Sequence, residues 1–342
     1  MSPRVRLALR GVVSAGLLVA LALLLDPGAV ASRLALLRPG WVAMALGVTV
    51  LQVVASAWRW RYTAGRLGLD LPLGRAVREY YLATFLNQVV PGGVGGDVTR
   101  AWRHASRDGV SGGGRAAVSA VVLERLSGQV VMITVAGLSG LALVVAAPGP
   151  LPAPGAAGLV VLAAGLAVGL LVLPVLLRRL LRLPVLRAIA LDARTALLGP
   201  ALPVQLATSV AVVGSYLAVF VLAARSVGVE TSTWALLPLV GPVLVTMLVP
   251  LTVAGWGLRE GAAAALWSSA GLSASDGVAI SVAYGLLVLA SSVPGAVLLA
   301  LIPLGRGRGD SGDPGRTGGP PPVGSGAPGP ATHPGGGGSP EG

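Results

Sequence analysis

Long apolar runs separated by short polar stretches dominate residues 1–303 of the chain. A helix that spans a bilayer needs about 20 predominantly apolar residues. The runs that come close to this length are 9–25, 41–58, 129–147, 156–177, 203–223, 234–254 and 278–303. Two shorter apolar segments, 79–90 and 261–271, each adjoin a stretch rich in proline or glycine. The pattern predicts an all-α integral membrane protein of about eight transmembrane helices, with one or two broken re-entrant elements.

The first apolar run has two interpretations. Arg4, Arg6 and Arg10 precede its apolar stretch 11–25, and Ala29-Val30-Ala31 has the small-x-small form of a signal-peptidase site, so a cleaved signal peptide is one alternative. Asp26 and Pro27 interrupt the approach to that site, and many apolar runs follow downstream. We therefore favour a retained first span.

The polar stretches between the runs differ in charge, and this difference predicts orientation. Arginine-rich short loops stay in the cytoplasm, which applies to the N-terminus, to residues 59–78 and to residues 178–194. Residues 148–155 carry no charge and residues 225–233 have no net charge, so both are expected outside. We expect a plasma or inner membrane protein with both termini in the cytoplasm.

The short segment at 79–96 is expected to be a re-entrant hairpin. The basic residues that follow it, Arg100, Arg103, Arg107 and Arg115, indicate a cytoplasmic stretch like the one that precedes it. The chain would then enter and leave the membrane on the same side.

Composition supports the membrane class and excludes several others. Hydrophobic residues make up 54% of the chain and charged residues 11%, which is too little polar surface for a soluble globule. The net charge of +12 comes from arginines that lie mostly between apolar runs, so anionic lipid headgroups, and not nucleic acid, are the expected partners. The chain has no cysteine, which excludes disulfides and thiolate chemistry. We divide it into a membrane domain, 1–303, and a Gly/Pro-rich tail, 304–342, expected to be disordered and cytoplasmic.

The first candidate site is the stretch FLNQVVPGGVGGDVTR at 85–100. A proline and four glycines, Pro91, Gly92, Gly93, Gly95 and Gly96, stand where an apolar helix should continue. Broken backbone is tolerated in a membrane only where protein or a water-filled cavity satisfies it. Asp97 suits the N-cap of a following helix, whose start can hold an anion. The alternative is that the glycines only permit close packing.

A second stretch, PLTVAGWGLRE at 250–260, repeats the first as P-x-x-V-[GA]-G-x-x-x-R. The match pairs Pro91 with Pro250 and Arg100 with Arg259, at identical spacing. Gly255 and Gly257 break the second element as the glycines at 92–96 break the first. Paired broken helices in corresponding halves of a membrane protein indicate a substrate site between structural repeats, here as an inverted repeat.

A charged pair, Glu124-Arg125, interrupts an otherwise apolar helix. Adjacent helical residues do not face one neighbour, so each needs its own partner. We expect Glu124 to pair with Arg100 or Arg259, and Arg125 to pair with Asp97 or Glu260. The arginine left over would meet a lipid phosphate. The alternative places Glu124 and Arg125 at the membrane interface. The aromatic and cationic stretch 58–62 is interpreted as an interface anchor without a ligand role.

These motifs give the chain a resemblance to the flippase-like membrane domain of the lysylphosphatidylglycerol synthase/flippase family. FLNQVVPGGVGGDVTR, LERLSG and VPLTVAGWGLREG occur in that order, and the resemblance covers roughly residues 9–303. In two-domain members a soluble domain makes the aminoacylated lipid, and this chain ends instead in its polar tail, so lysylphosphatidylglycerol is not implied as the substrate. The resemblance implies substrate-binding or transport roles for Asn87, Asp97, Arg100, Glu124, Arg125, Arg259 and Glu260, with Pro91, Gly92, Gly95, Gly96, Gly255 and Gly257 as broken-helix positions. The broken backbone and the repeat add Gly93 and Pro250 to these positions.

Three classes of function remain open at this point. We favour translocation of a phospholipid or polyprenyl-linked lipid between leaflets, because the broken elements can supply polar groups at membrane depth. The alternative is a non-catalytic scaffold or accessory subunit of a lipid-linked synthase or glycosyltransferase, which needs only the close packing. A lipid-modifying enzyme would want clustered carboxylates, and those here are scattered. We expect no catalytic residues, no metal site and no cofactor.

Overall fold

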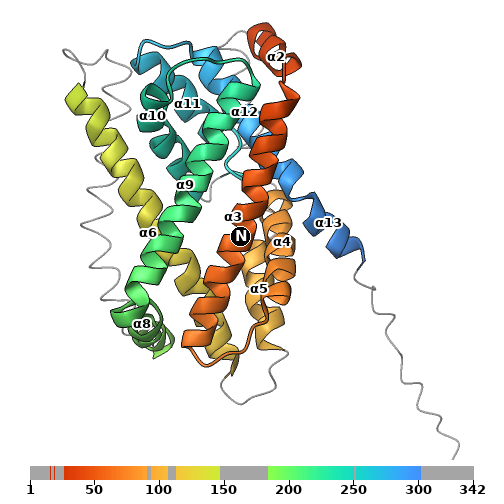
Figure 1. Ribbon diagram of the computed structural model, residues 1–342, viewed down its shortest axis with the longest axis vertical. Helices are drawn as coiled ribbons and strands as arrows, with labels where there is room; N and C mark the ends of the chain where they lie inside the picture. The colour runs from red at the N-terminus through yellow and green to blue at the C-terminus, as the bar shows by residue number, and fades with distance from the viewer. Residues whose placement is uncertain are drawn as a thin grey trace, which may run out of the picture. The chain divides into compact units, whose positions relative to one another are not determined.

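The computed structural model describes residues 16, 19, 27–90, 94–106, 113–146, 184–249 and 252–301. All the secondary structure in this part of the chain is helical (Figure 1). The chain divides into residues Met1–Ile302 and Pro303–Gly342, and the described residues belong to the first unit. The expected span 9–25 apart from residues 16 and 19, the expected span 156–177, the tail 304–342, and the positions Pro91, Gly92, Gly93 and Pro250 lie outside the described residues.

Among the described residues, four helical stretches are long and apolar enough to cross a membrane. They are Pro39–Arg66, Gly114–Leu143, Gly199–Ser226 and Ala274–Ala300. The corresponding helices are α3 (Pro39–Arg66), α6 (Gly113–Ala146), α9 (Leu202–Ser226) and α12 (Ala274–Ser291), which is followed by α13 (Val293–Ala300). Membrane-capable helices are thereby confirmed at the spans expected at 41–58, 129–147, 203–223 and 278–303, although the second begins earlier, at Gly113. The last is interrupted before Pro294, which cannot continue the backbone hydrogen bonding of α12.

The span expected at 234–254 is wrong. Its helix, α10 (Thr233–Val245), has 13 residues and contains Pro238 and Pro242, each of which removes a backbone donor. A 3₁₀ turn, η2 (Thr246–Leu248), follows it, and the chain is extended at Val249. The apolar pattern concealed this break, because the few proline, threonine and glycine residues do not lower the mean hydropathy of the run enough to mark it.

Two short helices form a hairpin where the re-entrant element was expected. Helix α4 (Leu73–Val89) packs against α5 (Gly95–Ala105), and both lie in the same half of the bundle (Figure 1). The chain thus enters and leaves this half at one end, as the charge pattern predicted. Helices α10 and α11 (Leu258–Ser269) form a second packed pair in the opposite half.

The two halves repeat one local design. Each has a long helix, a hairpin of two shorter helices and another long helix, so that α3–α6 corresponds to α9–α12. The first long helix ends in the same turn in both: Gly68 and Gly228 each have φ of 77°. Leu69 N–H donates to the Ala64 carbonyl and Val229 N–H to the Ala224 carbonyl, each at 3.0 Å. This left-handed glycine cap is the Schellman end of a helix.

The correspondence extends to the helices that precede α3 and α9. Helix α2 (Pro27–Ala35) packs on α12, where Arg33 pairs with Asp276 at 2.9 Å. Helix α8 (Pro184–Leu197) packs on α6, where Ser119 donates to Asp192 at 2.7 Å. In Figure 1, α3 descends from the end at which α2 lies, and α9 ascends from the end at which α8 lies. The two repeats are therefore inverted relative to each other.

Candidate functional site

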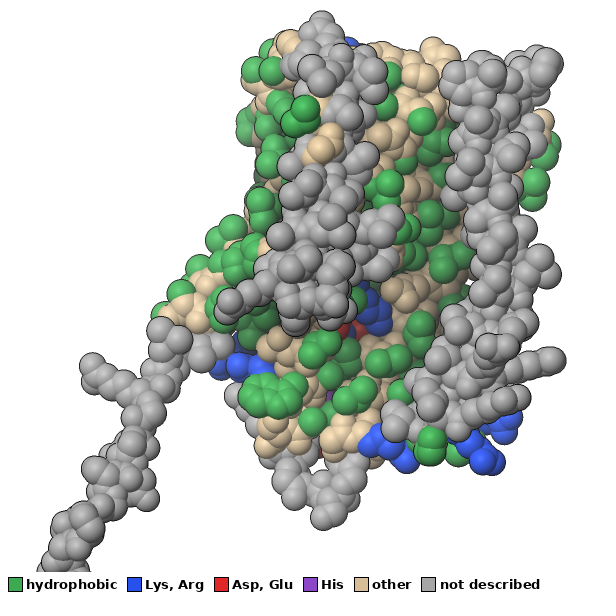
Figure 2. Space-filling model, turned by 180° about the vertical axis from the view of Figure 1, so that it is seen from behind, with side chains coloured by type: hydrophobic (Ala, Val, Ile, Leu, Met, Phe, Trp, Pro, Cys, Tyr) green, Lys and Arg blue, Asp and Glu red, His purple; other side chains and the backbone are tan. Residues whose placement is uncertain are grey.

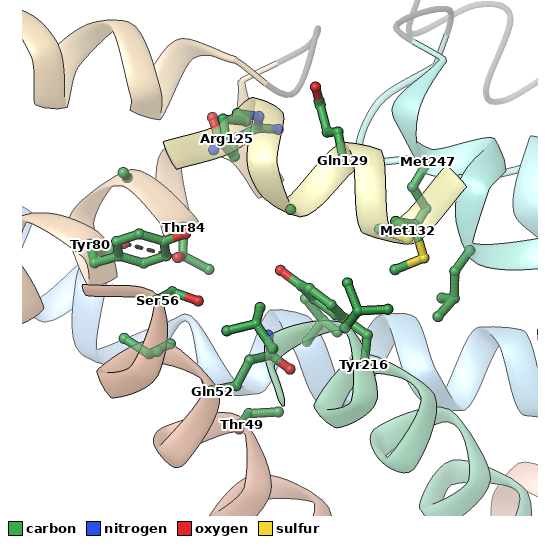
Figure 3. Close-up of a pocket in the computed structure, with 18 of the residues that line it drawn as sticks. Thr49, Gln52, Ser56, Tyr80, Thr84, Arg125, Gln129, Met132, Tyr216 and Met247 are labelled. Atoms are coloured by element: carbon green, nitrogen blue, oxygen red, sulfur yellow. Dashed lines mark hydrogen bonds between the residues drawn. The ribbon is translucent and has the colours of Figure 1, made fainter. Parts of the chain in front are cut away.

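A cavity of about 230 Å³ lies where the two repeats meet. Polar side chains from α3, α4 and α6 line one part of its wall, including Gln52, Thr84 and Gln129 (Figure 3). The second hairpin contributes an apolar part, including Met247. Asp97 of the first broken element and Ala254 of the second both line it, so the two elements reach one cavity as expected.

Glu124 is the centre of the charged network beside this cavity. Its carboxylate accepts hydrogen bonds from Arg59 Nη2 at 2.6 Å and from Arg100 Nη2 at 3.0 Å. Its side chain is 1% exposed, so Glu124 lies in the interior of the bundle. The pairing of Glu124 with Arg100 is confirmed, and the alternative interface position is wrong for this side chain.

Asp97 joins the network from the first turn of α5. Its carboxylate accepts from Arg100 at 2.9 Å, from Asn87 at 3.1 Å and from Arg125. The expected pairing of Arg125 with Asp97 is therefore confirmed. The expected N-cap role of Asp97 is wrong, since α5 begins at Gly95 and the N-cap position is Val94. Asn87 instead satisfies the start of α5, because its Oδ1 accepts from the Gly96 N–H at 2.8 Å.

Gly96 has a packing role as well. A Cβ at this position would collide with the Ala83 carbonyl of α4, so the close contact between α4 and α5 requires glycine. The interpretation of the glycines as permitting close packing is thus correct for Gly96. It does not exclude a site, because the contact brings Asn87 and Asp97 together.

Arg100 is held between two aromatic rings. Its guanidinium carbon lies 4.6 Å from the ring centre of Trp60 and 4.6 Å from that of Tyr80. Cation–π contacts of this kind stabilise a desolvated guanidinium. Arg100 is 1% exposed and is therefore fixed in the interior and does not line the cavity.

The interface-anchor interpretation of residues 58–62 is wrong for Arg59. Its side chain is 4% exposed, lines the cavity, and donates to Ser209 of α9 at 3.0 Å besides its bonds to Glu124. The aromatic neighbours concealed this role, since Trp58 is indeed exposed. A stripe of polar residues at helical spacing along α3 could have revealed it: Thr49, Gln52, Ser56, Arg59 and Thr63.

The second broken element holds a separate network. Arg259 pairs with the adjacent Glu260 at 2.6 Å, and Ser281 of α12 accepts from Arg259 at 2.8 Å and donates to Glu260 at 3.0 Å. Ser281 thus draws two neighbouring side chains to one point. The Gly257 N–H donates to Glu260 at 2.7 Å. Gly255 and Gly257 have φ of 82° and 86°, which the tight path of this loop requires.

The structure corrects the expectation for Arg259 and groups five of the other predicted site residues. Arg259 is 1% exposed, is fully engaged and does not line the cavity, so it is not the arginine left over for a lipid phosphate. Arg259 and Glu260 are also not joined to the first network by any described ion pair. The structure brings Asn87, Asp97, Arg100, Glu124 and Arg125 together.

Figure 2 shows acidic and basic side chains in a recess on a face where hydrophobic side chains predominate. Such a face fits a lipid environment. Inverted repeats of apolar helices with a charged cavity between broken hairpins define a multi-pass membrane protein.

Residues 7–295 match the family described as lysylphosphatidylglycerol synthase TM region, and the chain belongs to this family. This confirms the resemblance and indicates a role connected with membrane lipids. No curated protein and no solved structure matches the chain.

Proposed function

We propose that the protein moves a lipid between the two leaflets of its membrane. The headgroup passes through the cavity between the repeats while the acyl chains stay in the bilayer. The observation that carries this proposal is the charged and polar wall of a cavity enclosed by apolar helices. Charged groups inside a membrane protein are costly and mark the paths of polar substrates.

The energetic reason concerns the headgroup. An ion in hydrocarbon loses its hydration at a cost of several kcal/mol or more. A cavity that offers Arg125, Gln52 and Gln129 replaces part of that hydration. Both carboxylates of the network, Glu124 and Asp97, are paired with arginines.

The inverted repeats support an alternating mechanism. One hairpin, α4–α5, enters from the end at which α8 lies, and the other, α10–α11, enters from the opposite end (Figure 1). Each hairpin can therefore control access from one side of the membrane, as in transporters built from inverted repeats. We place the turn between α3 and α4 in the cytoplasm of a plasma or inner membrane, because Arg66, Arg75 and Arg78 flank this turn and α8, with Arg187 and Arg194, lies at the same end.

The test is reconstitution of the purified protein into vesicles that contain a small fraction of acyl-labelled fluorescent phospholipid. An impermeant reductant bleaches only the outer leaflet, so protein-dependent movement appears as bleaching beyond the outer-leaflet fraction. The site variant is Arg125→Gln. The matched control is Arg115→Gln, which removes an exposed arginine from the same helix outside the cavity.

Three outcomes separate the classes of function. Movement that Arg125→Gln slows and Arg115→Gln leaves unchanged supports translocation. Bleaching equal to that of protein-free vesicles contradicts it and favours the scaffold. We also propose that the protein is not an enzyme. Mass spectrometry of the recovered lipid tests this, and a chemically converted lipid would contradict it.

A further inference from the structure

Among the described residues, the charges around the cavity do not cancel. Three arginines, Arg59, Arg100 and Arg125, share two carboxylates, Asp97 and Glu124. The described side chains of this network therefore carry one net positive charge. The neighbouring ion pairs, Arg103–Glu79 and Arg259–Glu260, are each neutral and do not change the balance.

We propose that the cavity selects a headgroup with one net negative charge, a phosphodiester bearing an uncharged polar group. This inference rests on the proposed function and names its substrate class. A single negative charge would neutralise the network, whereas a zwitterionic headgroup would leave its charge unchanged and a cationic headgroup would add to it. An uncompensated charge in a low-dielectric site is unfavourable.

Arg125 is the cation that the phosphate contacts. Its side chain is 36% exposed and lines the cavity, whereas those of Arg59 and Arg100 are 4% and 1% exposed. Arg125 is bonded to Asp97 in this structure. A phosphate oxygen that takes this bond leaves Asp97 with Arg100 and Asn87, so the carboxylate keeps partners. The lipid phosphate therefore replaces Asp97 as the counter-charge of Arg125.

The rest of the wall suits hydroxyl groups better than an ammonium. Amide and hydroxyl side chains line the cavity: Gln52, Ser56, Thr84, Gln88 and Gln129. They can donate to and accept from a polyol. Both carboxylates of the network already serve arginines, so an ammonium would have to displace one. The cavity, about 230 Å³, is smaller than the roughly 300–1,000 Å³ of pockets for drug-sized ligands, which favours a small headgroup.

The experiment compares three acyl-labelled lipids with the same phosphodiester in the vesicle assay. Phosphatidylglycerol carries one negative charge, phosphatidylcholine is neutral overall, and lysylphosphatidylglycerol carries one positive charge. One unit charge acting over about 10 Å at an effective dielectric constant near 20 changes an equilibrium by roughly tenfold or more. We expect phosphatidylglycerol to move about tenfold faster than phosphatidylcholine, and lysylphosphatidylglycerol to be slowest.

Two variants change the balance in opposite directions. Arg125→Gln makes the network neutral and should abolish the preference, while Asp97→Asn adds a positive charge and should increase it. Arg115→Gln should leave the wild-type preference. If the wild-type protein moves the three lipids at equal rates, the proposed charge selection is overturned, and the proposed translocation stands.

If no lipid moves, or if a variant does not fold, a second measurement tests whether the site prefers the anionic headgroup. The wild-type protein in a neutral detergent is heated with each of the three lipids. A higher unfolding temperature with phosphatidylglycerol than with the other two supports the selective site without translocation. An equal effect of all three overturns the selective site as well.

Discussion

Glu124 and Arg100 pair in the interior of the bundle, although one belongs to α6 and the other to the broken element that begins α5. The same carboxylate also binds Arg59 of α3. One buried side chain therefore joins three helices of the first repeat; Arg59 has its described ion pair with Glu124, and Arg100 is shared between Glu124 and Asp97.

Removal of this carboxylate should destabilise the protein strongly. Glu124→Gln leaves Arg59 buried without its carboxylate and leaves Arg100 with Asp97 alone, which costs on the order of 3–5 kcal/mol. The free energy of unfolding in detergent measures the loss. Glu230→Gln is the control, because the Arg38–Glu230 pair is exposed and such a pair contributes about 1 kcal/mol or less. Equal effects of the two substitutions would contradict the structural role of Glu124.

Arg59 and Glu124 should show thermodynamic coupling. If Arg59→Gln and Glu124→Gln disrupt one contact, the double variant should lose less stability than the two single losses together, by roughly 0.5–3 kcal/mol. The same cycle between Arg59 and Glu260 should be additive within about 0.5 kcal/mol, since these side chains belong to separate networks. Additive losses for Arg59→Gln and Glu124→Gln would contradict this contact and support a position of Arg59 at the membrane interface.

Gly96→Ala should disrupt the first hairpin. The added methyl group collides with the Ala83 carbonyl, and overpacking of this kind costs about 1–3 kcal/mol. Gly47→Ala is the matched control, because a Cβ there meets nothing within 4 Å. The yield of folded protein and its unfolding temperature measure both. A folded Gly96→Ala protein as stable as the wild type would show that α4 and α5 can separate without cost.

The orientation can be tested with single cysteines, since the chain has none of its own. Asp70 and Glu230 occupy equivalent exposed positions in the turns after α3 and α9. In intact cells an impermeant maleimide should label Glu230→Cys directly and Asp70→Cys only after permeabilisation. The reverse pattern would invert the protein in its membrane.

The rule that adjacent helical residues need separate partners predicted two candidates for each of Glu124 and Arg125. The structure selects Arg100 for Glu124 and Asp97 for Arg125. The rule failed at Arg259 and Glu260, where a serine on another helix draws both to one point. A contact that depends on a third residue distant in the sequence cannot be predicted from the residues next to the pair.

The fold was predictable where hydropathy and helix length agree, as in α3 and α9. It was not predictable at 234–254, where α10 ends at Val245 and passes into a 3₁₀ turn although the apolar pattern continues. Arg59 was missed because its aromatic neighbours are typical of a membrane interface. Its burial depends on α3 continuing to Arg66 and on the position of α6, neither of which the residues around it specify.

The antiparallel contact of α3 with α9 lies at the pseudo-two-fold axis, because each is the first long helix of its repeat. A symmetry operation that exchanges the repeats maps this contact onto itself. Two conformations related by that exchange would therefore share the geometry of α3 and α9 while the hairpins trade places. In the proposed transport cycle, the helices that keep their contact and the helices that move would then be successive helices of the same repeat, and not separate domains.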